Sequence, residues 1–149
     1  MQKNLNIVLR KSTPEDLLQV TSLLESVNLP TKGIDYQFHN FFVTEEGIKI
    51  IGCIGLEIYN NIGLLRSLAV HPDKRNYSLG SQLVKKVFEL SDEQNLKELY
   101  LLTETADKFF PKLGFSVVTR DEVPIEIQNS DEYSSVCGIS AIVMKKILI

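Results

Sequence analysis

An arginine and a glycine, Arg75 and Gly80, stand in a short polar stretch between an apolar run and an amphipathic run. The apolar run, Leu64–Val70, is typical of a strand, and Pro72 ends it because proline has no N–H for a sheet ladder. A helix that begins after this stretch leaves backbone N–H groups of Asn76–Ser81 without intrahelical acceptors, and such groups bind anions. The spacing therefore predicts an anion site, to which the Arg75 guanidinium adds a positive charge.

The stretch Leu68–Gly80 resembles the acetyl-coenzyme A signature of the GCN5-related N-acetyltransferases. In that family a strand leads into Arg/Gln-x-x-Gly-x-Gly/Ala and then into a helix. Arg75 takes the basic position and Gly80 the last position, whereas Ser78 replaces the first glycine. Serine carries a penalty at this point if the turn needs a positive φ. We therefore expect Ser78 to bear on how tightly the cosubstrate binds.

The resemblance implies where acetyl-coenzyme A, the expected cosubstrate, would bind. The main chain of Leu68 and Val70 would pair with its pantetheine arm as a further strand would. The pyrophosphate would be held at the start of the helix by Arg75, Asn76, Tyr77, Ser78, Leu79, Gly80 and Ser81. No metal is expected, because the 2 cysteines and 2 histidines lack the spacing of a metal site.

A second segment, Thr103–Phe115, resembles the family's Asn-x-x-Ala…Tyr-x-Lys-x-Gly-Phe region. Thr103 stands where asparagine is common, and we expect it to orient a water molecule or to contact the pantetheine arm. Phe110 stands where a tyrosine often protonates the leaving thiolate. Because phenylalanine has no proton to donate, water would protonate coenzyme A, or the thiolate would leave unassisted. The neighbouring Phe109 is expected to line the substrate site. The residues that match the pattern are Ala106, Lys112, Gly114 and Phe115.

Several short motifs resemble a narrower group, the arsenic-resistance N-acetyltransferases. That group acetylates arsinothricin, an arsenic-containing glutamate analogue, and the transferase domain of N-acetylglutamate synthase shares part of the pattern. The resemblance spans about residues 5–149 and implies a small, anionic, amino-acid-like acceptor such as arsinothricin, phosphinothricin or a glutamate-like compound. The motifs are Gly55–Tyr59, Leu64–Val70, Leu101–Ala106 with Phe109-Phe110, and Glu122-Val-Pro124 followed by Ser140-Ala141 and Met144-Lys145.

Two charged residues, Arg66 and Glu57, stand in otherwise apolar strands. Burying a charge is costly unless it meets an opposite charge or reaches water. Arg66, with the adjacent Ser67, would bind an anionic group of the acceptor, since guanidinium groups bind carboxylates through two hydrogen bonds. Alternatively, Arg66 forms a salt bridge to Glu57 across the sheet, and the two interpretations are compatible. Glu57 would take the proton of the attacking ammonium, or it is a solvent-facing strand position.

The composition limits the class of protein. The 149 residues, of which 44% are hydrophobic, suit one globular domain over 1–149. A net charge of −3 argues against nucleic acid as a partner, and no apolar run approaches the length of a membrane span. The N-terminus lacks the apolar region of a signal peptide, and both cysteines suit reduced core thiols, so we expect a cytoplasmic protein. A homodimer is common in the family that the chain resembles and is considered for this chain.

Hydrophobic periodicity predicts the elements that position these residues. Strands are expected at 6–10, 41–44, 48–59, 62–70, 99–102, 115–119 and 140–145, and helices at 14–27, 79–94 and 105–113. Arg120–Gly138 would be loop or short helix. This order indicates an α/β fold whose sheet is mixed, mostly antiparallel, with one parallel crossover pair. The resemblance adds that this is the acetyltransferase fold, with helices on both faces and its two central strands splayed apart. The family resemblance also implies that Asn28–Phe38 covers the substrate.

The sequence therefore predicts an N-acetyltransferase that moves an acetyl group from acetyl-coenzyme A to the amine of a small acceptor by direct attack in a ternary complex. Two other functions stay open. One is a non-catalytic sensor of coenzyme A or an amino acid on the same fold, which Ser78 and Phe110 favour. The other is acetylation of protein amino-termini, which needs a groove for an extended peptide.

Overall fold

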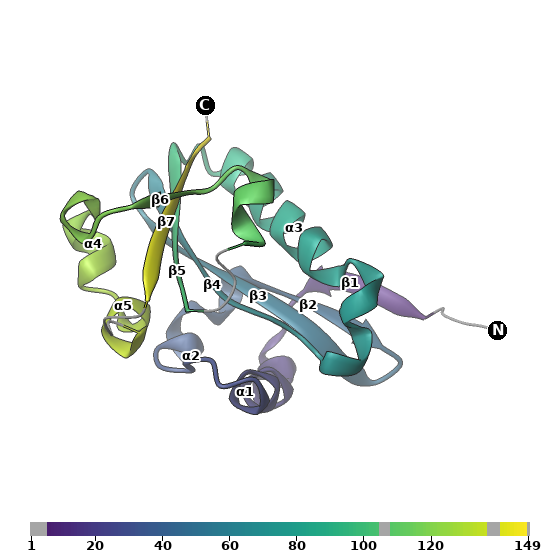
Figure 1. Cartoon of the computed structure of the whole chain (residues 1–149). Coiled ribbons are helices and arrows are strands. Elements are labelled where there is room, and N and C mark those ends of the chain that lie inside the picture. Colours follow the sequence, from purple (N-terminus) through teal and green to yellow (C-terminus); the bar gives the residue numbers. More distant parts are fainter. Residues whose placement is uncertain (1–5, 105–107, 137–140, 149) are drawn as a thin grey trace.

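The computed structural model describes residues 6–104, 108–136 and 141–148, and these contain one seven-stranded sheet (Figure 1). The order across the sheet is β1-β2-β3-β4-β5-β7-β6. β4 and β5 run parallel, and the other neighbouring pairs are antiparallel. The predicted mixed sheet with one parallel pair is thus confirmed. The strands are β1 (Ile7–Lys11), β2 (Phe41–Glu46), β3 (Lys49–Tyr59), β4 (Ile62–Val70), β5 (Glu98–Thr103), β6 (Ser116–Val118) and β7 (Ile142–Ile147).

Strand β4 is bulged, and this bulge sets the geometry at the centre of the sheet. Gly55 pairs with Arg66 but Cys53 pairs with Ala69, so two residues of β4 lie opposite one residue of β3. Ser67, at the bulge, has a φ of 61°. A bulge bends its strand and re-aims side chains. The bulge therefore divides β4 into two stretches, whose side chains alternate between the two faces of the sheet in different phase.

The parallel ladder between β4 and β5 is short. It pairs Ile62 with Glu98, and the last pair is Leu64 with Tyr100. Both strands continue for several residues beyond this point, to Val70 and Thr103. In the described part of the chain, the β4 edge from 65 to 70 therefore has no ladder partner on β5, which confirms the predicted splaying of the two central strands.

Helices cover both faces of the sheet, as predicted (Figure 1). α3 (Leu79–Glu93) packs its apolar stripe on one face, where Leu83, Val84 and Val87 join the largest buried cluster. The other face carries α1 (Leu17–Ser26) and α2 (Ile34–Gln37), and further along α4 (Ile125–Gln128) and α5 (Asp131–Val136). None of the helices in the described ranges has the length and apolar character of a membrane span.

Most predicted elements form with boundaries shifted by one or two residues. The predicted helix 14–27 begins as a 3-10 turn at Pro14–Asp16, because Thr13 and Asp16 form a capping box there. The predicted helix 105–113 is a 3-10 turn at Phe110–Leu113 in its described part, and residues 105–107 lie outside the description. It ends at Gly114, which takes the left-handed conformation typical of a glycine that closes a helix.

The segment that the sequence leaves as loop or short helix is helical in its described part. A 3-10 turn at Arg120–Glu122 leads into α4 and then α5, and residues from 137 to 140 are not described. Val123 and Ile127 bury their side chains against the sheet beside Leu64 and Tyr100. This packing fixes α5 on the face of the sheet from which Arg66 and Glu57 project.

Candidate functional site

The loop between β4 and α3 places a cation at the end of the strand. The Asp73 N–H donates a hydrogen bond to His71 Nδ1 (3.1 Å) and so caps the 3-10 turn Pro72–Tyr77. Arg75 is exposed, and its Nε donates to the Val70 carbonyl (3.3 Å). The Arg75 guanidinium therefore lies where β4 ends, on the solvent side of the predicted pyrophosphate site at residues 75–81, here called the phosphate loop.

The first turn of α3 carries backbone donors that the helix does not use. The Gln82 N–H donates to the Ser78 carbonyl (3.2 Å), so the N–H groups of residues 79–81 precede the first bond of this kind. A Cβ built at Gly80 would have Phe109 Cζ, 3.6 Å away, as its nearest described neighbour. The start of α3 therefore lies beside Phe109, and its first N–H groups are of the kind that binds an anionic ligand.

Ser78 joins the loop to the helix in the left-handed conformation, with a φ of 59°. Because the turn has a positive φ, the expected conformational penalty for serine at this position applies, since a Cβ is disfavoured in this region. Replacing Ser78 by glycine is expected to raise the free energy of unfolding by about 0.5–1 kcal/mol. Urea denaturation measures the change, with Asn60→Gly as the control. Asn60 has a similar φ of 57°, but asparagine tolerates this region, so its gain should be smaller. An equal gain at both positions would contradict the argument.

Arg66 is the most buried charged residue of the described chain, with 1% of its surface exposed. Its Nη1 donates to Glu57 Oε2 (2.7 Å) and to the Lys32 carbonyl (2.9 Å), and its Nε donates to Ser67 Oγ (2.9 Å). The predicted salt bridge to Glu57 is thus confirmed. The contacts with Ser67 and Lys32 join the β4 bulge to the segment predicted to cover the substrate.

Glu57 is buried and lies within the same network, so the alternative of a solvent-facing strand position is wrong. Besides its bond to Arg66, its Oε1 accepts a hydrogen bond from the Tyr59 hydroxyl. Burial, together with this bond, raises the pKa of Tyr59 well above its ordinary range. Both carboxylate oxygens of Glu57 are therefore occupied by protein donors.

Glu132 of α5 completes the cluster, and the sequence reasoning missed it. Its Oε1 lies 3.5 Å from Arg66 Nη2, and this oxygen is buried without a hydrogen-bond partner among the described residues. Burial, with a further contribution from the Glu57 charge, raises the pKa of Glu132 to about 7 against the attraction of Arg66. The signal that could have found it is the apolar spacing of Val123 and Ile127, which marks a packed helix just before it.

The remaining predicted residues, Thr103 and Phe109, lie at the end of β5 and beside the start of α3. Thr103 is the last residue of β5 and is half-buried, opposite Ile142 of β7. Phe109 is half-buried beside Gly80, so the structure brings together the second matched segment and the start of α3. Phe110 is buried edge-on against Phe109 in the core, which accounts for an apolar residue at this position.

Cys53, the cysteine within the described residues, is buried behind the bulge. Its thiol donates to the Ser67 carbonyl (3.2 Å), and burial raises its pKa to about 12. This agrees with the predicted reduced core thiol. Over residues 6–104, 108–136 and 141–148, no three His, Cys, Asp or Glu side chains group as metal ligands would.

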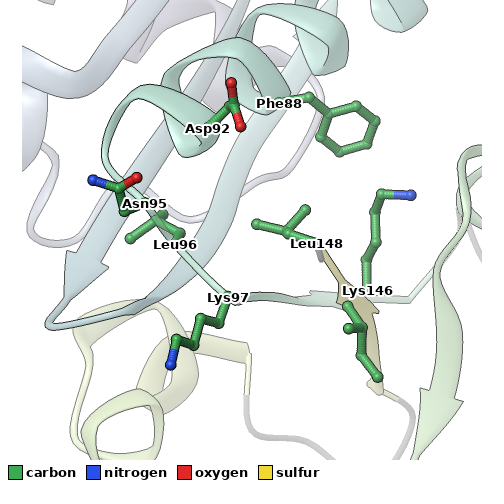
Figure 2. A pocket seen from close by; sticks show the side chains of 8 residues that line it. Phe88, Asp92, Asn95, Leu96, Lys97, Lys146 and Leu148 are labelled. Carbon is green, nitrogen blue, oxygen red and sulfur yellow. The ribbon is translucent and has the colours of Figure 1, made fainter.

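A separate hollow of about 510 Å³ lies at the other end of α3 (Figure 2). Phe88 and Leu96 form apolar parts of its lining, beside Leu148 near the end of the chain. The Lys146 ammonium lies over the Phe88 ring, 5.1 Å from its centre. Because the phosphate loop joins the N-terminal end of α3, this hollow is not part of the site described above.

Comparison with known proteins agrees with this geometry. Residues 37–117, more than half of the chain, match the family model described as "Acetyltransferase (GNAT) domain". The chain belongs to the GNAT acetyltransferase family. The resemblance that the sequence motifs indicated is thereby confirmed at the level of the family.

Curated relatives of this GNAT domain are much longer proteins. The amino-acid acetyltransferase of Aeromonas salmonicida is 27% identical in an alignment of 128 residues that covers 80% of this chain and 29% of the relative. That of Yersinia enterocolitica is 30% identical over 102 residues, 67% of this chain and 23% of the relative. The chain therefore spans less than a third of the curated relatives it matches.

Solved structures share the fold over nearly the whole chain. N-acetylglutamate synthase from Neisseria gonorrhoeae, complexed with coenzyme A and N-acetyl-glutamate, superposes with a TM-score of 0.83 at 19% identity. The match covers 99% of this chain and 36% of that protein. A GNAT-family acetyltransferase from Staphylococcus aureus gives a TM-score of 0.79 at 20% identity and covers 96% of this chain and 99% of its own. At these identities the likeness shows the fold.

Proposed function

We propose that the protein transfers the acetyl group of acetyl-coenzyme A to the amine of a small, anionic, amino-acid-like acceptor. The observation that carries this is the junction of β4 and α3. There the β4 edge from 65 to 70, which has no ladder partner on β5 among the described residues, leads into the start of α3, where the N–H groups of residues 79–81 precede the first helical hydrogen bond. Membership of the GNAT family and the amino-acid acetyltransferases among the relatives support the same chemistry.

In this proposal, acetyl-coenzyme A binds along the junction of β4 and α3. The main-chain N–H groups from Asn76 to Ser81 hold the pyrophosphate, assisted by the positive end of the α3 dipole and by Arg75. The edge of β4 at Leu68 and Val70 pairs with the pantetheine arm. This arrangement leads the thioester to the part of β4 beyond its ladder with β5, on the side where Thr103 ends β5.

The reaction needs no covalent enzyme intermediate. The acceptor ammonium loses one proton, and its nitrogen attacks the carbonyl carbon of the thioester. A main-chain N–H near Leu68 or Val70 stabilises the oxyanion. The C–N bond forms, the C–S bond breaks, and the coenzyme A thiolate leaves while the nitrogen gives up its second proton. Phe110 lies in the core and has no proton to donate, so the coenzyme A thiolate takes its proton from water.

The acceptor lies on the face that carries Arg66, Ser67 and Glu57, with Phe109 on the side of the cofactor. Arg66 supplies the positive charge that selects an anionic acceptor, and Glu57 holds the guanidinium in place through its 2.7 Å bond. Since both Glu57 oxygens are already bonded, we assign this carboxylate to positioning. Arsinothricin, phosphinothricin and L-glutamate are the acceptors to test first.

Thiol release on mixing the purified protein, acetyl-coenzyme A and a panel of amines and amino acids tests the proposal. Turnover with anionic amino acids is expected, and no release with any acceptor would remove the activity. If calorimetry then shows that coenzyme A binds, the sensor function is favoured. Release only with peptides that carry a free amino-terminus would favour the protein N-terminal acetyltransferase.

Arg75→Ala tests the cofactor site in the same assay. We expect the KM for acetyl-coenzyme A to rise about fivefold, because an exposed ion pair contributes about 1 kcal/mol. Lys85→Ala, on the exposed face of α3, is the control and should leave this KM unchanged. Equal effects of the two substitutions would contradict a phosphate contact at Arg75.

A further inference from the structure

We infer that Glu132 binds the ammonium of an α-amino-acid acceptor while Arg66 binds its carboxylate, so that the acceptor inserts between these two side chains. This rests on the function proposed above and names the acceptor class. The pair is already a cation and an anion held side by side, 3.5 Å apart. A zwitterion offers each of them the opposite charge.

The two ends of the Arg66 guanidinium are bound unequally. Nε and Nη1 donate to Ser67, Glu57 and the Lys32 carbonyl at 2.7–2.9 Å. Among the described residues, the contacts of Nη2 are longer, 3.5 Å to the Pro30 carbonyl and 3.5 Å to Glu132. A charged hydrogen bond at full strength is about 2.8 Å long. Nη2 is therefore the donor that can exchange its partners without disturbing the rest of the network.

Glu132 lacks what a buried carboxylate requires. Its side chain is 6% exposed, and Oε1 accepts no hydrogen bond from the described residues. Leaving such an oxygen unsatisfied costs about 1–3 kcal/mol or more for a charged group. Buried polar atoms without a partner are rare in native proteins. An ammonium with three N–H donors would satisfy Oε1, and the attacking amine of the acceptor is such a group before it loses its proton.

The charges of the cluster favour a zwitterion over either of its halves. Two carboxylates, Glu57 and Glu132, face one guanidinium, with the Tyr59 hydroxyl donating to Glu57. An acid without an ammonium would add a third carboxylate to this buried site. An amine without a carboxylate would draw Glu132 away from Arg66 and leave Nη2 with no carboxylate partner. An α-amino acid avoids both penalties.

The cluster lies beneath two segments that meet at the surface. Lys32 and Asp131 form a half-exposed ion pair there, 3.8 Å apart. A Cβ built at Gly33 would lie 2.4 Å from Asp131 Oδ2, so the segment after α1 and the start of α5 are in close contact. Each of these segments also contacts Arg66, through the carbonyls of Pro30 and Lys32 and through Glu132. Parting them opens the way to the Arg66–Glu132 pair.

The test is calorimetric binding of three probes to the full chain loaded with coenzyme A. L-glutamate carries both charged groups, isoglutamine lacks the α-carboxylate, and glutarate lacks the ammonium. We expect the unmodified protein to bind L-glutamate at least tenfold more tightly than either of the other two. Glu132→Gln should weaken the binding of L-glutamate at least tenfold. It should strengthen the binding of glutarate several-fold, because it removes a carboxylate that repels this probe. Glu126→Gln, on the exposed side of α4, is the control and should change neither.

A merely structural role for Glu132 would weaken both probes by the same factor, and that result would overturn the inference. Unchanged binding of both probes in Glu132→Gln would overturn it as well. Thiol release by the unmodified protein distinguishes a failure of the Glu132 inference from a failure of the proposed function. Turnover of amino acids with no effect of Glu132→Gln removes the role of Glu132 alone, whereas no turnover with any acceptor removes the function.

Discussion

Replacing Arg66 by methionine is expected to lower the free energy of unfolding by about 3–5 kcal/mol, a large share of a typical domain's stability. Methionine keeps most of the side-chain volume but removes the charge and the three short hydrogen bonds. Glu57 and Glu132 would then remain buried without a cation. The loss comes from these uncompensated carboxylates more than from packing, because a long apolar side chain still fills the space.

Urea denaturation of the purified variants measures this loss, and Arg10→Met is the matched control. Arg10 also lies between two carboxylates, with Asp16 at 2.8 Å and Glu45 at 2.9 Å, but its side chain is 30% exposed. Asp16 is only 8% exposed, but water reaches Arg10 and Glu45 and screens their charges, so a smaller loss of about 1–2 kcal/mol is expected there. Adding Glu132→Gln to Arg66→Met should recover part of the stability. Equal losses at positions 66 and 10, or no recovery, would contradict an origin in buried charge.

The sequence alone could predict much of this fold because its strands and helices have clear local signals. Gly47 and Asn60 mark the two hairpin turns, and both have the positive φ that such turns need. The apolar spacing of α3 and the break at Pro72 correctly place the end of β4 and the start of α3. These signals depend on neighbours in the chain, so no knowledge of the tertiary structure is required.

Other features depend on contacts between distant segments and could not be predicted from such patterns. β7 inserts between β5 and β6, an order that the spacing of strands does not specify. The bulge at Ser67 has no marker, because serine is not a residue that typically takes a φ of 61°. Sequence spacing predicted that Arg66 meets Glu57. It could not predict Glu132, which reaches the cluster only because α4 and α5 fold back over the sheet.

The pH dependence of stability distinguishes Glu132 from the other carboxylates of the protein. Its pKa is raised from the ordinary 4.5 to about 7, so the folded chain keeps a proton that the unfolded chain releases between these two pH values. Stability attributable to this group therefore falls as the pH rises from about 4.5 to 7. The full penalty, on the order of 3 kcal/mol, applies above that range. The charged groups around it are Arg66 and Glu57, with Lys32 and Asp131 at the adjoining surface.

Glu132→Gln removes this titration and keeps the size of the side chain. We expect the variant to match the unmodified protein at pH 4.5 and to exceed it increasingly up to pH 8, by up to about 3 kcal/mol in the free energy of unfolding. Urea denaturation across this range measures the difference, and Glu126→Gln, at an exposed position, should show none. A constant difference from pH 4.5 to 8 would mean that Glu132 stays ionised on Arg66. The pair would then be a permanent salt bridge, and an acceptor would have to break it rather than exchange with a weakly held carboxylate.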